Sequence, residues 1–315
     1  MSPRTSEQDR RLAAIEALVC RDVGRKTQAL IDANRGGLAA AAAALATATR
    51  VGLITGFFVP RGDVAAPETD GPVGTALLAA ALAACGVPAR IAVDTPSVEA
   101  VRSAVRATEE DVAVDEIVLS EEGAIDATTR LWRQENLSHV VAIERCGRSA
   151  DGRPRNMRGV DVSPWTLPLD TLFEGGDWTK LAVGDGGNEI GMGNADGALR
   201  DLLIYGDKQY NGGIVPAHIT DAAVPVTVSN WGGYGIAAAL AAVLGRPDIV
   251  HDEATERRML LACSLDGLID GVTGSTLPTS DGMGEEIHVA IVTMLRTILG
   301  IGVPVNDWPA TAPKA

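Results

Sequence analysis

Residues 180–193 read KLAVGDGGNEIGMG, a short apolar run followed directly by a loop with five glycines in ten residues. The run Lys180–Val183 is typical of a buried strand in a parallel sheet, and ligands bind beyond the carboxyl ends of such strands. Glycine lets the backbone approach a ligand closely, while Asp185, Asn188 and Glu189 offer side-chain oxygens. We therefore predict a binding loop here, with a plain structural turn as the alternative.

Similar apolar runs occur before and after this loop. They are Val51–Thr55, Ala89–Val93, Glu116–Leu119, His139–Ile143 and Val224–Val228. Segments long enough for crossover helices separate several of them, namely Pro72–Cys85, Pro96–Ala107 and Gly123–Glu135. The pattern predicts an α/β fold: an open, doubly wound (Rossmann-like), mostly parallel sheet with helices on both faces.

Helical patterns flank this alternation at both ends of the chain. Ser6 and Asp9 form a capping box before Leu12, Ile15, Leu18 and Val19, and a second helix is expected over Gly37–Thr49. Three more helices are expected, over Gly235–Leu244, Glu253–Leu268 and Glu285–Leu299. We predict a helical N-terminal arm over residues 1–50, one α/β domain over 51–304 and a tail over 305–315.

Composition excludes several classes of protein. The 315 residues include 27 basic and 41 acidic side chains, a net charge of −14, which argues against nucleic acid as a partner. The longest apolar runs fall short of the ~18 residues of a membrane span, and residues 1–10 lack the apolar stretch of a secretory signal. The four cysteines are far apart and fit a reduced, cytoplasmic compartment. The composition leaves a homo-oligomer open.

Polar residues follow the first two predicted strands. Thr55 and Gly56 end the first one, and the loop then leads to Glu68, Asp70 and Gly71. Asp70 before Pro72 is also a natural helix cap, as is Thr95 before Pro96. Asp94 stands where a dinucleotide enzyme places its ribose-binding acid, or it caps the next helix. The standard phosphate fingerprints are absent after these strands.

The strand His139–Ile143 ends at Glu144 and Arg145, which form either a structural ion pair or a site. Arg145, Arg148, Arg153, Arg155 and Arg158 follow within fourteen residues that hold one acid, a local charge of +4. Guanidinium groups are the natural partners of carboxylates, so the arginines predict a small anionic substrate. The alternative is a solvated surface loop.

Two later loops and a set of acids complete the candidates. Asn230, Trp231 and Gly232 follow the strand Val224–Val228, and Asp281 precedes the last helix. Oxygen ligands from Asp70, Asp94, Asp185, Glu189 and Asp281 could hold Mg²⁺ or Mn²⁺, although the sequence requires no cofactor. Cys146 would be a nucleophile only if its neighbours acidified it, and the lone histidines are expected to cap or pack.

Several of these segments together resemble the D-glutamate cyclase family, in its C-terminal domain, from about residue 20 to 300. The matching motifs are ITGF (54–57), ETDGP (68–72), ERCGR (144–148), NMRG (156–159), GDGGNEIGMG (184–193) and SNWGG (229–233). The resemblance implies conversion of D-glutamate to 5-oxo-D-proline and water, a lyase reaction without a redox cofactor or ATP.

This reaction needs residues that bind the free carboxylate of glutamate and residues that transfer protons from its ammonium group to the leaving group. We predict Glu144, Asp185 and Glu189 as catalytic residues. The predicted substrate-binding residues are Thr55, Gly56, Glu68, Asp70, Gly71, Arg145, Arg148, Asn156, Arg158, Gly186, Gly187, Asn188, Asn230, Trp231, Gly232 and Asp281. Two other classes stay open: a non-catalytic module that binds an acidic metabolite, and a nucleotide- or phosphate-dependent enzyme.

Overall fold

Six strands form the central sheet of the computed structural model, which describes residues 6–24, 26–61, 64–194 and 213–302. Their order is β5-β4-β1-β6-β7-β8, and every neighbouring pair is parallel. The strands are β1 (Val51–Ile54), β4 (Ala89–Asp94), β5 (Ala113–Ile117), β6 (His139–Ile143), β7 (Thr179–Gly184) and β8 (Ala222–Pro225). Each one overlaps a predicted run, so the doubly wound α/β fold is confirmed.

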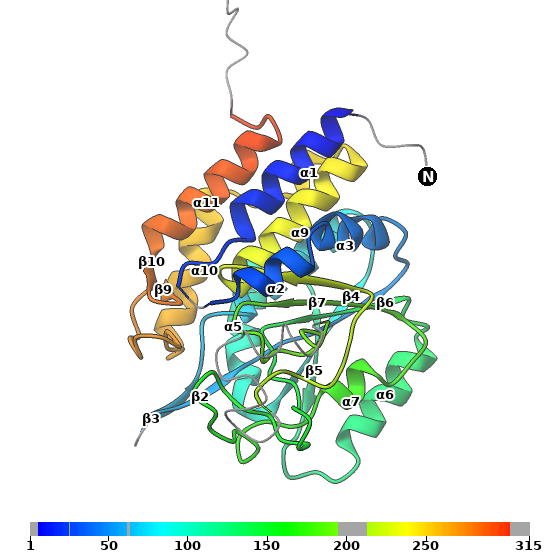
Figure 1. Cartoon of the computed structure of the whole chain (residues 1–315), viewed down its shortest axis with the longest axis vertical. Coiled ribbons are helices and arrows are strands. Elements are labelled where there is room, and N and C mark those ends of the chain that lie inside the picture. Colours follow the sequence, from blue (N-terminus) through cyan, green and yellow to red (C-terminus); the bar gives the residue numbers. More distant parts are fainter. Residues whose placement is uncertain (1–5, 25, 62–63, 195–212, 303–315) are drawn as a thin grey trace, which may run out of the picture.

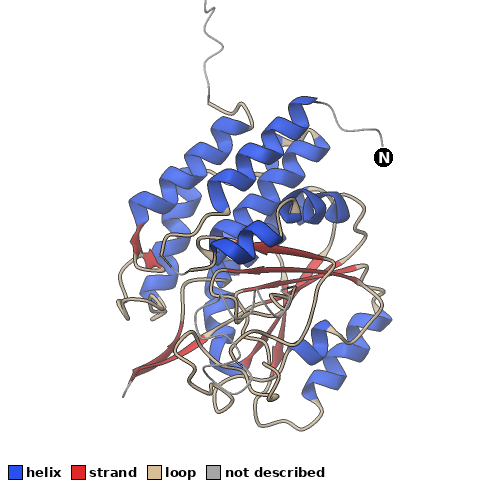
Figure 2. Ribbon diagram, in the orientation of Figure 1, coloured by secondary structure: helices blue, strands red, loops and turns tan. Residues whose placement is uncertain are grey.

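Helices cover both faces of this sheet, many more on one face than on the other (Figure 1 and Figure 2). The larger layer contains α1 (Ser6–Val19), α3 (Gly37–Leu45), α4 (Pro72–Ala84), α5 (Val98–Thr108), α9 (Ser229–Leu244), α10 (Glu253–Leu265) and α11 (Glu285–Ile298). The smaller layer contains α6 (Ala124–Gln134) and α7 (Asp170–Phe173). The two layers give the molecule two hydrophobic cores, one on each side of the strands.

Strand β6 shows how alternating side chains supply both cores. Val141 and Ile143 pack into the larger core, whereas Val140 and Ala142 pack into the smaller one with Trp132 of α6. All five residues of β6 are buried, as expected for a strand covered on both faces. The charged residues that follow β6 therefore emerge from the middle of the protein.

The N-terminal helices pack on the larger layer, which confirms the predicted helical arm. Helices α1 and α3 both contact α9, and the predicted apolar face of α1 is buried. Between them lies α2 (Gln28–Ala33), which we did not predict because six residues are too few to show a helical period. The arm is thus part of the main core.

Helix α9 starts at Ser229, six residues before the predicted start, and the preceding strand β8 ends early, at Pro225. Gly232 and Gly233 indicated a loop. In the structure they allow close packing: a Cβ on Gly232 would lie 2.3 Å from Val183 Cγ1, and one on Gly233 would lie 2.5 Å from the carbonyl oxygen of Gly74. Tertiary packing here outweighs the low helix propensity of glycine.

Other elements lie outside the predicted pattern or differ from it. A hairpin of β2 (Phe58–Arg61) and β3 (Val64–Pro67) follows β1, and a short pair of β9 (Thr279–Ser280) and β10 (Met283–Gly284) precedes α11. Thr95 does not cap its helix; its hydroxyl donates to the Ile117 carbonyl and accepts from the Leu119 N–H.

No helix among the described residues is long and apolar enough to cross a membrane. The predicted tail, 305–315, lies outside the described residues.

Candidate active site

The strand order reverses direction between β1 and β6, which creates a crevice at their carboxyl ends. A cavity of about 240 Å³ lies there. Its lining residues are Phe57, Val59, Glu68, Glu144, Asn156, Met157, Arg158, Asp185, Asn188, Gly271, Val272 and Asp281. Seven of these twelve are predicted site residues: Glu68, Glu144, Asn156, Arg158, Asp185, Asn188 and Asp281.

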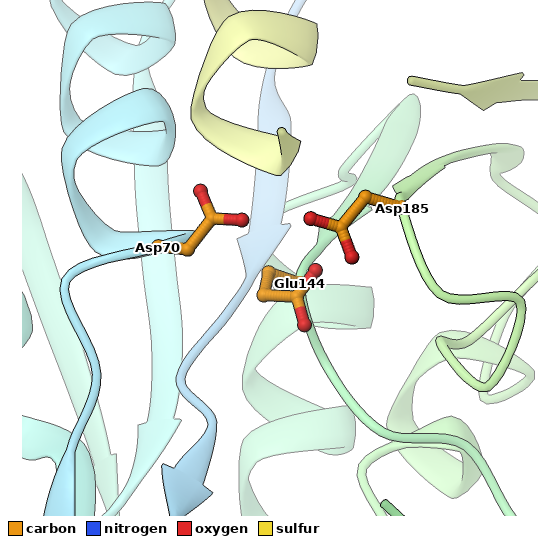
Figure 3. A group of neighbouring side chains, drawn as sticks. All are labelled: Asp70, Glu144 and Asp185. Atoms are coloured by element: carbon orange, nitrogen blue, oxygen red, sulfur yellow. The ribbon is translucent and has the colours of Figure 1, made fainter. Parts of the chain in front are cut away.

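Three buried carboxyl groups converge beside this cavity (Figure 3). Asp70 precedes α4, Glu144 follows β6 and Asp185 follows β7, and one oxygen of each lies within 4.8 Å of the others. Oxygen donors at this spacing suit a hard divalent cation, so these three could hold Mg²⁺ or Mn²⁺. Glu144 is thus a candidate metal ligand, although the set of ligands predicted from the sequence did not include it.

Burial and mutual repulsion change the acidity of this group. Desolvation, and then the negative charge of Asp281, raise the pKa of Asp70 to about 7, against hydrogen bonds from the Ser229 and Asn230 amides. The pKa of Glu144 is raised well above its ordinary value, first by burial and then by the charge of Asp185 and other nearby acids. Carboxyl groups with raised pKa values are suited to exchange protons near neutral pH.

Hydrogen bonds to the side chains of Asp70 and Asn230 join the N-termini of α4 and α9. Asp70 Oδ2 and Oδ1 accept from the backbone N–H groups of Ser229 (2.9 Å) and Asn230 (2.7 Å). In return, Asn230 Oδ1 accepts from the N–H groups of Gly71 (2.9 Å) and Gly74 (2.7 Å). Asp70 is therefore a cap, as one alternative proposed, but it caps α9 rather than its own helix.

Glu189 holds the glycine loop from within. Its Oε1 accepts from the N–H groups of Asp185 (3.0 Å) and Gly186 (2.6 Å), and its Oε2 accepts from that of Gly187 (2.8 Å). Gly184 leaves room for this carboxylate, because a Cβ there would lie 2.5 Å from Oε2. Glu189 does not line the cavity, so the geometry gives it a structural role in place of the predicted catalytic one.

Four of the five clustered arginines form ion pairs with acids. Three of these acids lie outside residues 145–158, over which the charge was counted, and the fourth is Asp151 within them. The pairs are Arg145 with Asp94 (2.5 Å), Arg148 with Asp170 (2.9 Å), Arg153 with Asp161 (3.1 Å) and Arg155 with Asp151 (2.6 Å). Arg145 is completely buried and also donates to the carbonyls of Gly56 and Leu167. The predicted substrate roles of Arg145 and Arg148 are replaced by structural ones, and Asp94 is a partner of Arg145 rather than a ribose ligand.

Arg158 is the arginine of this group that lines the cavity, on an exposed loop. Asn156 shapes that loop, because its Oδ1 accepts from the N–H groups of Arg158 (2.9 Å) and Val160 (3.0 Å). Asn188 joins it to the glycine loop by donating to the Arg155 carbonyl (2.9 Å). The cavity is therefore lined by acids and by one arginine of this group.

The other predicted binding residues lie behind the cavity lining. A Cβ on Gly71 would lie 2.7 Å from Glu144 Cβ and 2.8 Å from Thr55 Oγ1, so glycine allows the acid to approach. Gly56 has a positive φ of 100°. Trp231 Nε1 donates to His288 Nδ1 (2.8 Å), and both rings are buried. Thr55, Gly56, Gly71, Gly186, Gly187, Asn230, Trp231 and Gly232 support the site without lining it.

Cys146 is buried, and desolvation raises the pKa of its thiol to about 12. A buried thiol that keeps its proton is a poor nucleophile, which argues against the reactive role considered for it. Of the four histidines, His139 and His288 are buried, as expected for packed residues.

The sequence patterns missed five lining residues: Phe57, Val59, Met157, Gly271 and Val272. Phe57 and Met157 lie inside the motifs ITGF (54–57) and NMRG (156–159), but nothing in those motifs indicated that these two side chains line a cavity. Gly271 and Val272 belong to a loop organised by buried Asp270, which accepts from the N–H groups of Val272 (2.9 Å) and Gly282 (2.8 Å). Only the fold brings that loop to the cavity.

Comparison with known proteins agrees with the motifs at this site. Residues 15–296 match the family described as D-glutamate cyclase-like, C-terminal. The mitochondrial D-glutamate cyclase of Homo sapiens is 34% identical over 214 residues, which are 64% of this chain and 34% of the human protein. The chain thus spans about a third of the length of that relative. Because the family match extends over most of the sequence, the chain belongs to the D-glutamate cyclase-like C-terminal family.

Proposed function

We propose that this cavity is an active site that cyclises D-glutamate to 5-oxo-D-proline and water, or cyclises a closely related acidic amino acid to the corresponding lactam and water. The observation that carries the proposal is the pairing in one cavity of the acids Glu144 and Asp185 with the cation Arg158. The name of the human relative supports the same reaction. A volume of about 240 Å³ accommodates a single amino acid.

The reaction is balanced without a co-reactant. The amino nitrogen forms a bond to the side-chain carboxyl carbon, and one carbon–oxygen bond of that carboxyl breaks. The ammonium group loses two protons, and the departing oxygen leaves as water with two protons. Two proton transfers, from nitrogen and to oxygen, therefore need groups on the protein.

The cavity offers residues for each part of this process. Arg158 would hold the carboxylate that does not react, because a guanidinium group binds a carboxylate through two parallel hydrogen bonds. The carboxyl groups of Glu144 and Asp185 attract the substrate ammonium and exchange its protons with the departing oxygen. Asp70, Glu144 and Asp185 could hold a divalent cation, which would act as a Lewis acid toward the reacting carboxylate.

The geometry does not favour a nucleotide or phosphate ligand. Three N–H groups of the glycine loop already bind Glu189, so they cannot receive a phosphate. Four acids, Glu68, Glu144, Asp185 and Asp281, line the cavity and would repel a multiply charged anion. A non-catalytic binding module would use the same cavity, and turnover separates it from an enzyme.

The test is formation of 5-oxoproline by purified protein from D-glutamate and from L-glutamate, each with and without Mg²⁺ or Mn²⁺, followed by chiral chromatography. We expect product from D-glutamate. Glu144→Gln and Asp185→Asn keep side-chain size and should lower turnover by ~10²–10⁴-fold. Glu121→Gln, at an exposed site, is the matched control. Absence of product from every substrate, or full activity in both variants, would refute the proposal.

A further inference from the structure

Ser229 connects two of the three converging acids. It is the first residue of α9, and its backbone N–H donates to Asp70 Oδ2 at 2.9 Å. Its hydroxyl donates to Glu144 Oε2 at 2.6 Å. Ser229 therefore binds both Asp70, which precedes α4, and Glu144, which follows β6. Asp70 lies 159 positions away from Ser229 in the sequence, and Glu144 lies 85 positions away.

The bond between Ser229 and Glu144 is short and shielded from water. Ser229 is completely buried, and Glu144 is 6% exposed. A distance of 2.6 Å lies at the short end of the range for a hydrogen bond between a hydroxyl and a carboxyl oxygen. With little water to compete, this bond fixes the rotation of the Glu144 carboxyl group.

Two other features hold Glu144 at its backbone and Cβ. Its φ of 45° lies in the left-handed region, which few residues other than glycine adopt. Gly71 leaves space directly beside its Cβ, where a second Cβ would lie only 2.7 Å away. The hydrogen bond from Ser229 then occupies Oε2, and Glu144 still lines the cavity.

We infer that Ser229 is a positioning residue, which holds Oε2 of Glu144 so that the other carboxyl oxygen is presented to the substrate. The inference rests on the function proposed above. Ser229 does not line the cavity, so its hydroxyl acts on the reaction through Glu144 rather than as a nucleophile.

The test compares Ser229→Ala and Ser229→Cys with wild-type protein. Alanine removes the hydroxyl donor but keeps the backbone N–H that binds Asp70, whereas cysteine keeps a weaker donor. Because small misplacements of a reacting group cost up to ~10²-fold in rate, we expect kcat to fall about 10- to 100-fold in Ser229→Ala, and less in Ser229→Cys. KM should change less than threefold, since the carboxylate held by Arg158 is untouched.

Ser138→Ala is the matched control. The half-buried Ser138 hydroxyl also makes two hydrogen bonds, since it accepts from the Thr49 N–H (3.0 Å) and donates to the Arg50 carbonyl (3.0 Å), but it precedes β6 at the opposite end from Glu144. Its kcat should stay at the wild-type value. Wild-type kcat in Ser229→Ala, or an equal loss in Ser138→Ala, would overturn the inference.

A second measurement separates this inference from the proposed function. If wild-type protein forms no product, the proposed function fails, and crystal structures of wild-type and Ser229→Ala protein then decide the role of Ser229. We expect the Glu144 carboxyl group to rotate away from its wild-type position in the variant. An unchanged position of that group would overturn the inference whatever the activity.

Discussion

At the scale of single residues, the partner of a carboxylate decides its role. Glu189, Asp94 and Asp185 all follow or end strands of the sheet, yet they differ completely in surroundings. Glu189 accepts three N–H groups of its own loop, Asp94 pairs with Arg145, and Asp185 lines the cavity. Acids whose oxygens are engaged by amides or by a guanidinium stabilise the structure, and those that reach the cavity are the candidates for the proposed reaction.

Replacement of Arg158 tests substrate recognition. Arg158→Gln removes a charged donor for a carboxylate, and a hydrogen bond to a charged group contributes ~1.5–3 kcal/mol. We expect KM for D-glutamate to rise by about 10-fold or more, with a smaller change in kcat, because this carboxylate is held equally before and during the reaction. Steady-state kinetics of the purified variant measures both values.

Arg153→Gln is the control for that substitution. Arg153 is an exposed arginine of the same segment that pairs with Asp161 and does not line the cavity. Its KM should match that of wild-type protein. Equal values of KM in wild type and Arg158→Gln would show that the substrate carboxylate binds elsewhere.

At the scale of elements, the site depends on how α4 and α9 meet. Their N-termini are tied by Asp70 and Asn230, and their axes approach at two glycines: a Cβ on Gly74 would lie 2.7 Å from Asn230 Cα, and one on Gly233 would lie 2.5 Å from the Gly74 carbonyl oxygen. This contact places Asp70 and Ser229 beside Glu144. Packing of two helices thus sets the distances between acids from different parts of the sequence.

Substitutions at this contact should destabilise the protein. Asn230→Ala removes the cap of α4, which leaves the buried Gly74 N–H without its acceptor and the Gly71 N–H with only Asp70 Oδ1, so we expect a loss of ~1–3 kcal/mol in the free energy of unfolding. Gly74→Ala should cost at least as much, because the atom that it would approach belongs to the backbone. Urea denaturation followed by circular dichroism measures both losses.

Gly284→Ala is a matched glycine control. Gly284 has a φ of −74° and open space around its Cβ position, so alanine fits without strain. Its free energy of unfolding should stay within ~0.5 kcal/mol of wild type. If Gly74→Ala were equally harmless, the close approach of α4 and α9 would not be needed for stability.

At the scale of the whole molecule, ion pairs between segments that are distant in the sequence make stability depend on pH. His218 Nε2 lies 3.0 Å from Asp170 Oδ2, and Arg148 binds the same carboxylate. Burial alone would raise the pKa of Asp170, but hydrogen bonds from His218 and Arg148 outweigh it and lower this pKa to about 2. The hydrogen bond with Asp170 raises the pKa of His218 above its ordinary value.

The direction of the pH effect follows from these shifts. A histidine whose pKa is raised by folding stabilises the protein fully below its unfolded pKa of about 6.5, and this contribution is lost as pH rises through the folded pKa. His218→Gln should therefore lower the free energy of unfolding more at about pH 6 than at about pH 9. Urea denaturation at both pH values checks this, and an equal loss at the two would contradict it.

The contribution of Asp170 has the opposite direction. Because its folded pKa of about 2 lies below the ordinary 3.8, its stabilisation is present above about pH 4 and lost as pH falls toward 2. Between these limits both groups are charged and the pair is complete. The segments that carry Arg148, Asp170 and His218 are therefore held together most strongly in weakly acidic to neutral solution.

The sequence by itself determined the six strands, most of the helices and the edge of the sheet where the site lies. Hydrophobic periodicity, proline and glycine act locally, so Lys180–Val183 and the glycines after it could be interpreted from their neighbours alone. The same local patterns identified seven of the twelve residues that line the cavity.

Only the tertiary structure decided which acids and arginines face the cavity. Arg145 meets Asp94 across 51 positions, and Asp70 meets Asn230 across 160, so a count of charges along the chain could not pair them. Ser229 gave no local indication of its role because both of its acidic partners come from other elements. A charge in a protein is compensated by what lies near it in space, and that depends on the order of strands and the packing of helices.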